Sequence, residues 1–278
     1  MNDSLAMKIR RLNLAGMVQT VDMRVEQAIK ESLSYVEFLE LIINDEHLNR
    51  GRNRRNELIR RAKFPQHKTI EEFNFSWQPG LNRQEIYGFG TCEFIRKREN
   101  IAFIGLPGTG KTHLSIAVGG KAIEQGYSVL FTTLSDMMEE LYLSRADNSF
   151  RQKLKKYTQP DLLIIDEFGL KKLNQTSVDD LYEVISKRYE INSTVITSNK
   201  EFSEWGHVLF DPVLASAILD RFVHHCSFVA IDGDSYRMKE RINSAGTHKR
   251  GRPRKSESQE VSGGDENGRI DRESGVSA

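Results

Sequence analysis

A glycine-rich stretch followed by a lysine and a threonine is the strongest chemical signal in this sequence of 278 residues. Residues 105–112 read Gly-Leu-Pro-Gly-Thr-Gly-Lys-Thr and fit the P-loop pattern G-x-x-x-x-G-K-[ST]. The backbone N–H groups of such a loop surround phosphates, its lysine reaches the β- and γ-phosphates, and its hydroxyl binds Mg²⁺. We therefore expect ATP to be bound by Gly105, Pro107, Gly108, Thr109, Gly110, Lys111, Thr112 and the adjoining His113.

Two acids follow an apolar run further along the chain. Residues 162–165 are all Leu or Ile, and Asp166 and Glu167 come directly after them, with Asp166 55 residues beyond Lys111. Ligands of parallel sheets bind at the carboxyl ends of the strands, so we expect Asp166 to join Thr112 as a Mg²⁺ ligand. Glu167 can polarise a water for attack on the γ-phosphate. The alternative is an acid pair that only caps the next turn, and the P-loop makes it the minor one.

Single polar residues end the later apolar runs. Asn199 follows the run 194–197, where its amide can hydrogen-bond the γ-phosphate or the attacking water, although an Asn in this place is usually a turn residue. Arg221 lies in the last turn of the last expected helix, and Arg237 follows the last expected strand. Arginine stabilises the charge that develops during phosphoryl transfer. The alternative for each arginine is an ordinary surface salt bridge.

The elements that must position these residues alternate between strand and helix over residues 98–240. Short apolar runs predict strands at residues 100–104, 128–132, 162–166, 194–197 and 227–231. Helical spacing of apolar residues predicts helices at residues 112–125, 134–144, 148–156, 175–191 and 213–222. Nearly continuous apolar strands between helices indicate an α/β fold, a parallel sheet covered by helices on both faces.

Three further zones flank this region. Residues 1–69 show helical periodicity and predict a small all-α domain that binds a partner or DNA. Within it, Ser34 and Glu37 form a capping-box pattern that starts a helix running to about Lys63, before Pro65. Residues 70–97 are interpreted as a linker, and residues 246–278 as a disordered tail.

Composition narrows the class of protein. Hydrophobic residues make up 38% and charged residues 28% of the chain, with a net charge of +1 that by itself indicates no partner. No apolar run approaches the ~18 residues of a membrane span, so no membrane is expected as a partner. Two cysteines, Cys92 and Cys226, form neither a disulfide framework nor a zinc pattern. The sequence predicts a cytoplasmic protein and excludes membrane, collagen-like and disulfide-rich classes.

Positive charge is concentrated locally. Residues 50–63 hold seven Arg or Lys and one acid, Glu57, which favours contact with a phosphate backbone through residues such as Arg54 and Arg55 over a solvated helix face. Residues 249–255 include Arg-Gly-Arg-Pro around Arg252, similar to an AT-hook core that lies in a narrow minor groove. The alternative for the tail is a basic segment that touches phosphate unspecifically or contacts nothing.

Taken together, the motifs resemble a known family. The P-loop, the acids at 166–167, Thr-Ser-Asn at 197–199, and the segments 205–221 and 234–237 look like the IstB-type transposition helper ATPases. That family belongs to the AAA+ initiator and helicase-loader branch and is similar to DnaC. Leu-Ala-Gly-Met at 14–17 and the segment 61–73 look like its helical N-terminal domain. The resemblance covers residues 5–240 and leaves out the tail.

The resemblance carries specific implications. It implies an ATPase that assembles as a homo-oligomer on double-stranded DNA and cooperates with an insertion-sequence transposase. It assigns Asn199 to sensor 1, Arg221 to an arginine finger that acts on a neighbour's ATP, and Arg237 to sensor 2. It also implies an extra helix after the second strand that follows the DNA backbone. Charge and position together select its basic residues, Arg145, Arg151, Lys153, Lys155 and Lys156.

The sequence thus predicts a DNA-stimulated, Mg²⁺-dependent AAA+ ATPase that serves transposition. A replicative helicase loader of the DnaC type is the first alternative, because the ATPase core does not separate the two. A second alternative is a DNA-binding module that binds ATP only to hold its assembly together and does not hydrolyse it. Glu167 argues against this alternative. A small-molecule P-loop kinase is the third, and no second basic lid for a small acceptor is found.

Overall fold

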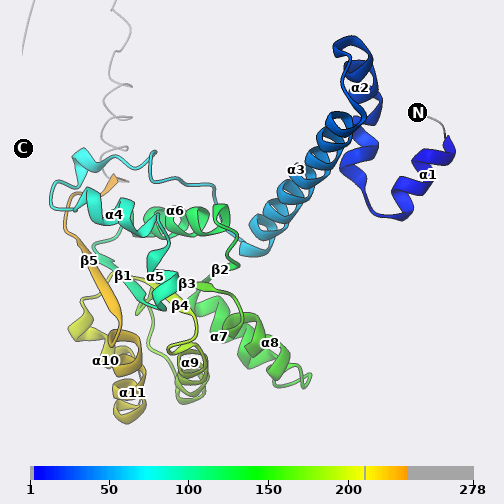
Figure 1. The fold of residues 1–278 in the computed structure, drawn as a ribbon. Helices are drawn as coiled ribbons and strands as arrows, with labels where there is room; N and C mark the ends of the chain where they lie inside the picture. The colour runs from blue at the N-terminus through cyan, green and yellow to red at the C-terminus, as the bar shows by residue number, and fades with distance from the viewer. Residues whose placement is uncertain (1–2, 210, 237–278) are drawn as a thin grey trace, which may run out of the picture. The chain divides into compact units, whose positions relative to one another are not determined.

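The chain folds around one parallel sheet. A computed structural model describes residues 3–209 and 211–236, which hold five strands in the order β2-β3-β4-β1-β5 (Figure 1). The strands are β1 (Asn100–Gly105), β2 (Val129–Thr133), β3 (Leu162–Phe168), β4 (Ser193–Ser198) and β5 (Cys226–Ile231). Every pair of neighbours is parallel. The predicted α/β fold is confirmed, and each expected strand lies within one or two residues of its predicted bounds.

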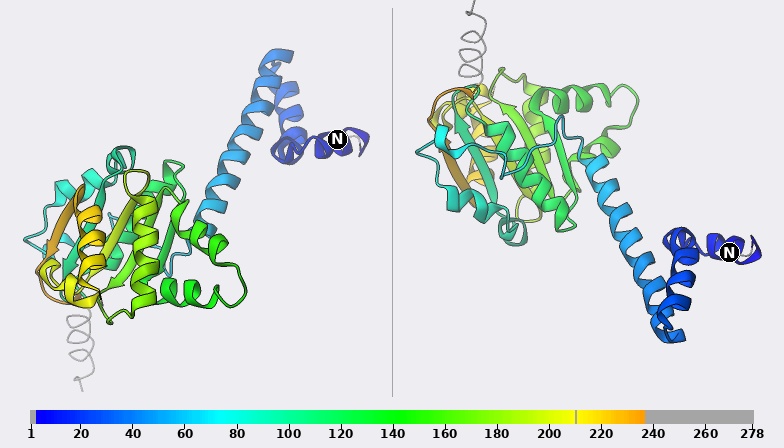
Figure 2. Two further views of the ribbon diagram at one scale, coloured as in Figure 1. Left: turned by 90° about the horizontal axis from the view of Figure 1, so that it is seen from below. Right: turned by 90° about the horizontal axis from the view of Figure 1, so that it is seen from above.

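Helices cover both faces of this sheet, as predicted. The later helices are α6 (Lys111–Glu124), α7 (Leu134–Leu143), α8 (Phe150–Thr158), α9 (Gln175–Arg188), α10 (Trp205–Val208) and α11 (Pro212–Val223), with the short η2 (Phe202–Glu204) before α10. Alternate residues of β3 show why both faces need cover, because Ile164 packs in the core beneath α6 and Leu163 in the core beneath α7 and α9. Figure 2 shows α9 (yellow-green) and α11 (yellow) crossing one face in the view from below.

The predicted N-terminal helical zone contains α1 (Asp3–Arg11), α2 (Ala15–Glu31) and α3 (Tyr35–Ala62). The predicted capping box is present, because Ser34 accepts a hydrogen bond from the Glu37 amide and Glu37 accepts one from the Ser34 amide. The Glu46 carboxylate on α3 accepts the amides of Gly16 and Met17 at 2.7 and 3.2 Å, which caps the start of α2. The hydrogen bond from Arg50 lowers the pKa of Glu46 most strongly. Burial raises this pKa and the two amide hydrogen bonds lower it, so the net shift is downward.

The segment 70–97, interpreted from the sequence as a linker, has structure of its own. It contains η1 (Phe75–Trp77), α4 (Arg83–Phe89) and α5 (Glu93–Lys97). Its apolar side chains, among them Ile70, Ile86 and Phe94, are buried in the core that also contains α6. It therefore packs against the sheet domain instead of running as an exposed connection, because its apolar residues complete that core.

Two further predictions concern a membrane span and the C-terminal residues. No helix within residues 3–209 and 211–236 has the length and apolar character to cross a membrane. The tail 246–278 with Arg252, and the predicted sensor residue Arg237, lie outside the described residues.

Candidate nucleotide-binding site

The P-loop connects β1 to α6 at the carboxyl end of β1, which lies between β4 and β5 in the sheet. Gly110 has a φ of +100°, and a Cβ there would lie 2.5 Å from the Phe73 ring. A Cβ at Gly105 would lie 2.2 Å from the carbonyl oxygen of Ile231 in β5. Only glycine satisfies both positions, since any side chain would clash with a neighbour from a distant part of the chain. The loop is thus shaped by tertiary contacts as well as by its own sequence.

The P-loop lysine is buried within its loop. Lys111 is the first residue of α6 and is only 6% exposed. Its ammonium donates hydrogen bonds to the carbonyl oxygens of Gly105 at 2.8 Å and Leu106 at 2.7 Å. The Thr109 hydroxyl donates to the same Leu106 carbonyl at 2.9 Å. These bonds hold the cation at the inner side of the turn.

A hydroxyl and a carboxylate meet beside the loop. The Thr112 hydroxyl donates to Asp166 Oδ1 at 2.9 Å, with Oδ2 at 3.1 Å, and Asp166 is 6% exposed at the end of β3. Hydroxyl and carboxylate oxygens are ligands that Mg²⁺ accepts, so the pair fits a magnesium ion. The structure therefore brings together the two residues that the sequence analysis selected as metal ligands.

Thr197 also belongs to this group, although the sequence analysis included it only in the Thr-Ser-Asn motif at 197–199 and gave it no role. Its hydroxyl, on β4, donates to Asp166 and accepts a hydrogen bond from the Glu167 amide at 3.2 Å. It therefore holds both acids in place. Apart from that motif, the signal in the sequence is a hydroxyl side chain near the end of an apolar run, which is too common to be selected by itself.

The two consecutive acids have different surroundings. The pairing of β3 with β4 shifts register between Ile165 and Phe168, and Glu167 adopts a φ of +59°. A bulge of this kind redirects a side chain, and it is frequent next to active sites. As a result Asp166 is buried while Glu167 is exposed. One acid is held by hydroxyl groups, and the other is accessible to water.

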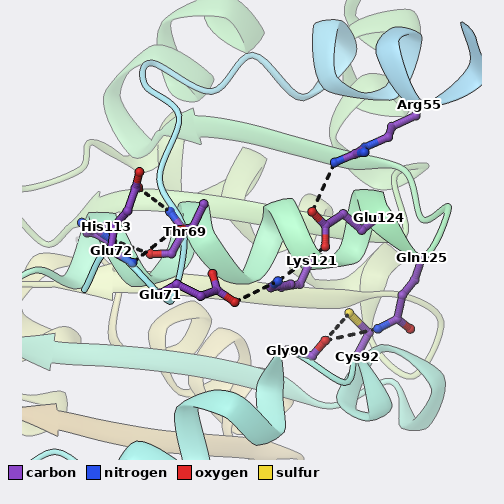
Figure 3. A network of polar contacts seen from close by, with 10 residues as sticks. All are labelled: Arg55, Thr69, Glu71, Glu72, Gly90, Cys92, His113, Lys121, Glu124 and Gln125. Carbon is purple, nitrogen blue, oxygen red and sulfur yellow. Dashed lines mark hydrogen bonds and ion pairs between the residues drawn. The ribbon is translucent and has the colours of Figure 1, made fainter. Parts of the chain in front are cut away.

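Asn199 and His113 have different surroundings. Asn199 is exposed directly after β4, whose last residue, Ser198, pairs with Ile104 of β1. His113 instead faces the segment before the sheet, with its Nε2 2.8 Å from the Thr69 carbonyl oxygen (Figure 3). Its ring lies 5.4 Å from that of Phe73. Burial lowers the pKa of His113, so the neutral ring is favoured.

Aromatic side chains cover the loop from two distant segments. The Tyr236 amide donates to the Gly108 carbonyl at 2.9 Å, and its ring lies 4.6 Å from Trp77 and 5.7 Å from Phe73. The Tyr236 hydroxyl donates to the Asn74 carbonyl. The chain after β5 and the segment before α4 thus meet at the P-loop.

Arg221 lies at the amino-terminal ends of the strands, opposite the end that carries the P-loop. It sits in the last turn of α11, donates to the Ala217 carbonyl at 2.9 Å, and has its guanidinium 5.2 Å from the Tyr182 ring centre. A small cavity there is lined by Arg221 together with Asn100 and Thr194, which stand at the starts of β1 and β4. The six-residue strand β1 separates this end from the P-loop by roughly 20 Å. Arg221 therefore does not reach the P-loop of its own chain.

The neighbouring Arg188 is buried and structural. Its guanidinium donates to the carbonyl oxygens of Tyr157 at 3.0 Å and Pro160 at 2.9 Å, and to the Thr194 hydroxyl at 3.0 Å. Burial lowers the pKa of Arg188 to about 9. The side chain ties the end of α8 to the start of β4, so it is not available to another chain.

Replacing Arg188 should therefore destabilise the fold. Arg188→Met leaves several buried carbonyl groups without a donor, and we expect the free energy of unfolding to fall by about 3 kcal/mol or more. Urea denaturation followed by circular dichroism measures this change. Lys187→Met, at an exposed position of the same helix, is the matched control and should change stability by less than about 0.5 kcal/mol. Equal effects of the two substitutions would contradict the structural role.

The predicted DNA-binding residues differ in their partners. Arg145 pairs with the buried Asp180, and both Lys153 and Lys156 pair with Glu140. Arg55 on α3 pairs with Glu124 on α6 at 3.2 Å (Figure 3). Three of them are exposed and make no ion pair within the described part of the chain: Arg54, Arg151 and Lys155.

Comparison with known proteins agrees with this geometry. The family model described as IstB-like ATP binding protein matches residues 7–244. The chain is 39% identical over 231 residues to the ATP-binding protein of insertion sequence IS5376 from Geobacillus stearothermophilus, covering 83% of this chain and 92% of that one. It is 36% identical over 237 residues to the corresponding protein of insertion sequence IS21 from Pseudomonas aeruginosa, covering 85% and 89%.

Solved structures show the same fold at low sequence identity. AMPPCP-bound DnaA from Aquifex aeolicus is similar with a TM-score of 0.52 and 20% identity, over 66% of this chain and 57% of that chain. The DnaC helicase loader is similar with a TM-score of 0.50 and 19% identity, over 61% and 96%. Both likenesses support the AAA+ P-loop fold that the sheet order and the loop indicate. With the family model spanning nearly the whole described chain, this protein belongs to the family of IstB-like ATP-binding proteins of insertion sequences.

Proposed function

We propose that the protein is an Mg²⁺-dependent ATPase that oligomerises on double-stranded DNA and assists a transposase. The observation that carries the hydrolytic part is the contact between Thr112 and Asp166 beside the P-loop, with Glu167 exposed next to them. Lys111 binds the β- and γ-phosphates, and Thr112 and Asp166 hold Mg²⁺. Glu167 orients the attacking water, while Asn199 and Arg237 contact the γ-phosphate. The other P-loop residues bind phosphate through their amides.

The position of Arg221 supports an oligomer. An arginine at the amino-terminal ends of the strands, away from its own P-loop, can stabilise phosphoryl transfer only at the site of another chain. We propose that Arg221 acts on the ATP of the next protomer in a homo-oligomer. Each complete active site then belongs to two chains.

The N-terminal helices offer a surface for a protein partner. They expose many large apolar side chains, including Leu5, Met7, Leu12, Met23, Ile29, Tyr35, Val36, Leu39, Ile43 and Leu48. Exposed apolar surface of this extent is typical of an interaction site. The relatives that share most of the chain come from insertion sequences, which favours a transposase as the partner. A helicase loader is the alternative, and the likeness to DnaC supports it only at the level of the fold.

DNA binding through α8 has a quantitative test. Each phosphate contact on duplex DNA contributes about −0.9 to the slope of log affinity against log salt concentration. We expect Arg151→Ala combined with Lys155→Ala to make that slope less steep by about 1.8. Fluorescence anisotropy with a labelled duplex at several NaCl concentrations measures it.

A matched control separates contact from general charge loss. Arg96→Ala combined with Lys97→Ala removes one exposed arginine and one exposed lysine from α5. This helix packs into the core beneath α6, not into the core that contains α8. We expect this pair to leave the slope unchanged. If the α8 pair behaves as the α5 pair does, Arg151 and Lys155 do not contact the DNA backbone.

A further inference from the structure

The basic side chains of α8 fall into two sets with different surroundings. Arg151 and Lys155 are four residues apart, lie on one side of the helix, and are exposed. Lys153 and Lys156 are three residues apart and face α7. Only the first set is free of ion pairs among the described residues. The helix therefore presents one accessible pair of cations and one pair that is already engaged.

A single carboxylate engages the second pair. Glu140 on α7 accepts a hydrogen bond from Lys153 Nζ at 2.8 Å, and others from Lys156 Nζ and from the hydroxyl of the buried Tyr157. Burial by itself would raise the pKa of Glu140, but the bonds from Lys153, Lys156 and Tyr157 lower it to about 2. The carboxylate is therefore ionised at neutral pH and holds two cations with one negative charge.

We propose that Glu140 occupies, on Lys153 and Lys156, the place that a DNA phosphate takes when α8 docks on the double helix. This inference rests on the proposed DNA contact of α8 and adds its regulation. Glu140 keeps half of the basic residues of the helix occupied until DNA is already held by Arg151 and Lys155. A phosphate then replaces the carboxylate on both lysines.

The structure allows this exchange at low cost. The side chains of Lys153 and Lys156 keep 39% and 28% of their surface exposed, so a phosphate can approach them. Partly exposed ion pairs contribute little to stability, and lysine is a flexible donor that changes partners readily. A cavity of about 400 Å³ beside Glu140 is lined also by Lys63, Asp136 and Asp166. Its volume gives room for waters that hydrate the carboxylate after the lysines leave.

The decisive variant removes the charge of Glu140 and keeps its shape. Glu140→Gln in the full chain should bind a labelled duplex roughly threefold to tenfold more tightly near physiological salt, the scale of two partly exposed ion pairs. Glu139→Gln is the matched control, because it makes the same change of charge at an exposed position of the same helix. It should change affinity less than about twofold.

A double-mutant cycle tests whether the gain passes through the two lysines. With Lys153→Ala and Lys156→Ala present, Glu140→Gln should strengthen binding no more than Glu139→Gln does. If Glu140→Gln proves unfolded by circular dichroism, Glu140→Asp, whose shorter side chain weakens the hold, should give an intermediate gain in affinity.

The outcomes separate this inference from the proposed function. If Arg151→Ala and Lys155→Ala weaken binding while Glu140→Gln matches Glu139→Gln, the DNA surface stands and the role of Glu140 is wrong. A gain that persists without the two lysines also overturns it. If no α8 variant changes DNA affinity, the DNA contact of α8 fails, and the role of Glu140 fails with it.

Discussion

A protein carrying Glu167→Gln is expected to bind ATP as the unchanged chain does and to release phosphate about 10²–10⁴ times more slowly. The substitution keeps the side-chain shape but removes the base that accepts a proton from the attacking water. Because Glu167 is exposed and is joined to Thr197 through its backbone amide, which the substitution keeps, binding and folding should not change. A phosphate-release assay and titration with a fluorescent ATP analogue measure the two quantities.

Three controls define what such a loss means. Lys111→Ala should instead abolish ATP binding, because the lysine is the cation that the P-loop supplies to the β- and γ-phosphates. EDTA should stop turnover by the unchanged chain, since Thr112 and Asp166 are proposed to act through Mg²⁺. Glu183→Gln, an acid on α9 that pairs only with exposed Lys187 in the described contacts, should be silent. Turnover of Glu167→Gln at the rate of the unchanged chain would exclude its role in activating water.

Arg221→Ala is expected to bind ATP normally and to hydrolyse it on the order of 10³–10⁵ times more slowly, the contribution of arginine fingers in phosphoryl-transfer enzymes. The physical reason is the distance of roughly 20 Å along β1 between this arginine and its own P-loop. If the active site is shared, the specific activity of the unchanged chain should rise with protein concentration and with DNA that aligns protomers. Steady-state rates over a dilution series measure this dependence.

Mixing two inactive proteins gives the sharper test of a shared site. The Lys111→Ala chain keeps Arg221, and the Arg221→Ala chain keeps its P-loop, so a mixture should recover part of the activity. Arg96→Ala, another exposed arginine, should remain active alone. If dilution leaves specific activity unchanged and the mixture recovers nothing, Arg221 is not a trans-acting finger. Lys187 would be the next candidate, because Arg188 is enclosed by its own chain.

The sequence by itself determined the elements and the main residues of the candidate site. Continuous apolar runs located the strands, because both faces of the sheet are covered. Helical periodicity located the helices, because burial of every third to fourth residue leaves a regular apolar pattern. The P-loop and the acids at 166–167 were identified because phosphate and metal binding need particular residues at fixed spacing, directly after strands. The capping box at Ser34 was found for the same reason, since its two hydrogen bonds join residues only three apart.

Only the tertiary structure decided how these residues are supported. Thr197 holds Asp166 from 31 residues away, and the burial of Arg188 depends on carbonyl groups about 30 residues upstream. The pairing of Lys153 and Lys156 with Glu140 likewise requires α7 and α8 to lie side by side. A sequence pattern records which side chains are apolar and how they are spaced. It does not record which distant polar groups meet, because that depends on how the sheet brings separate elements together.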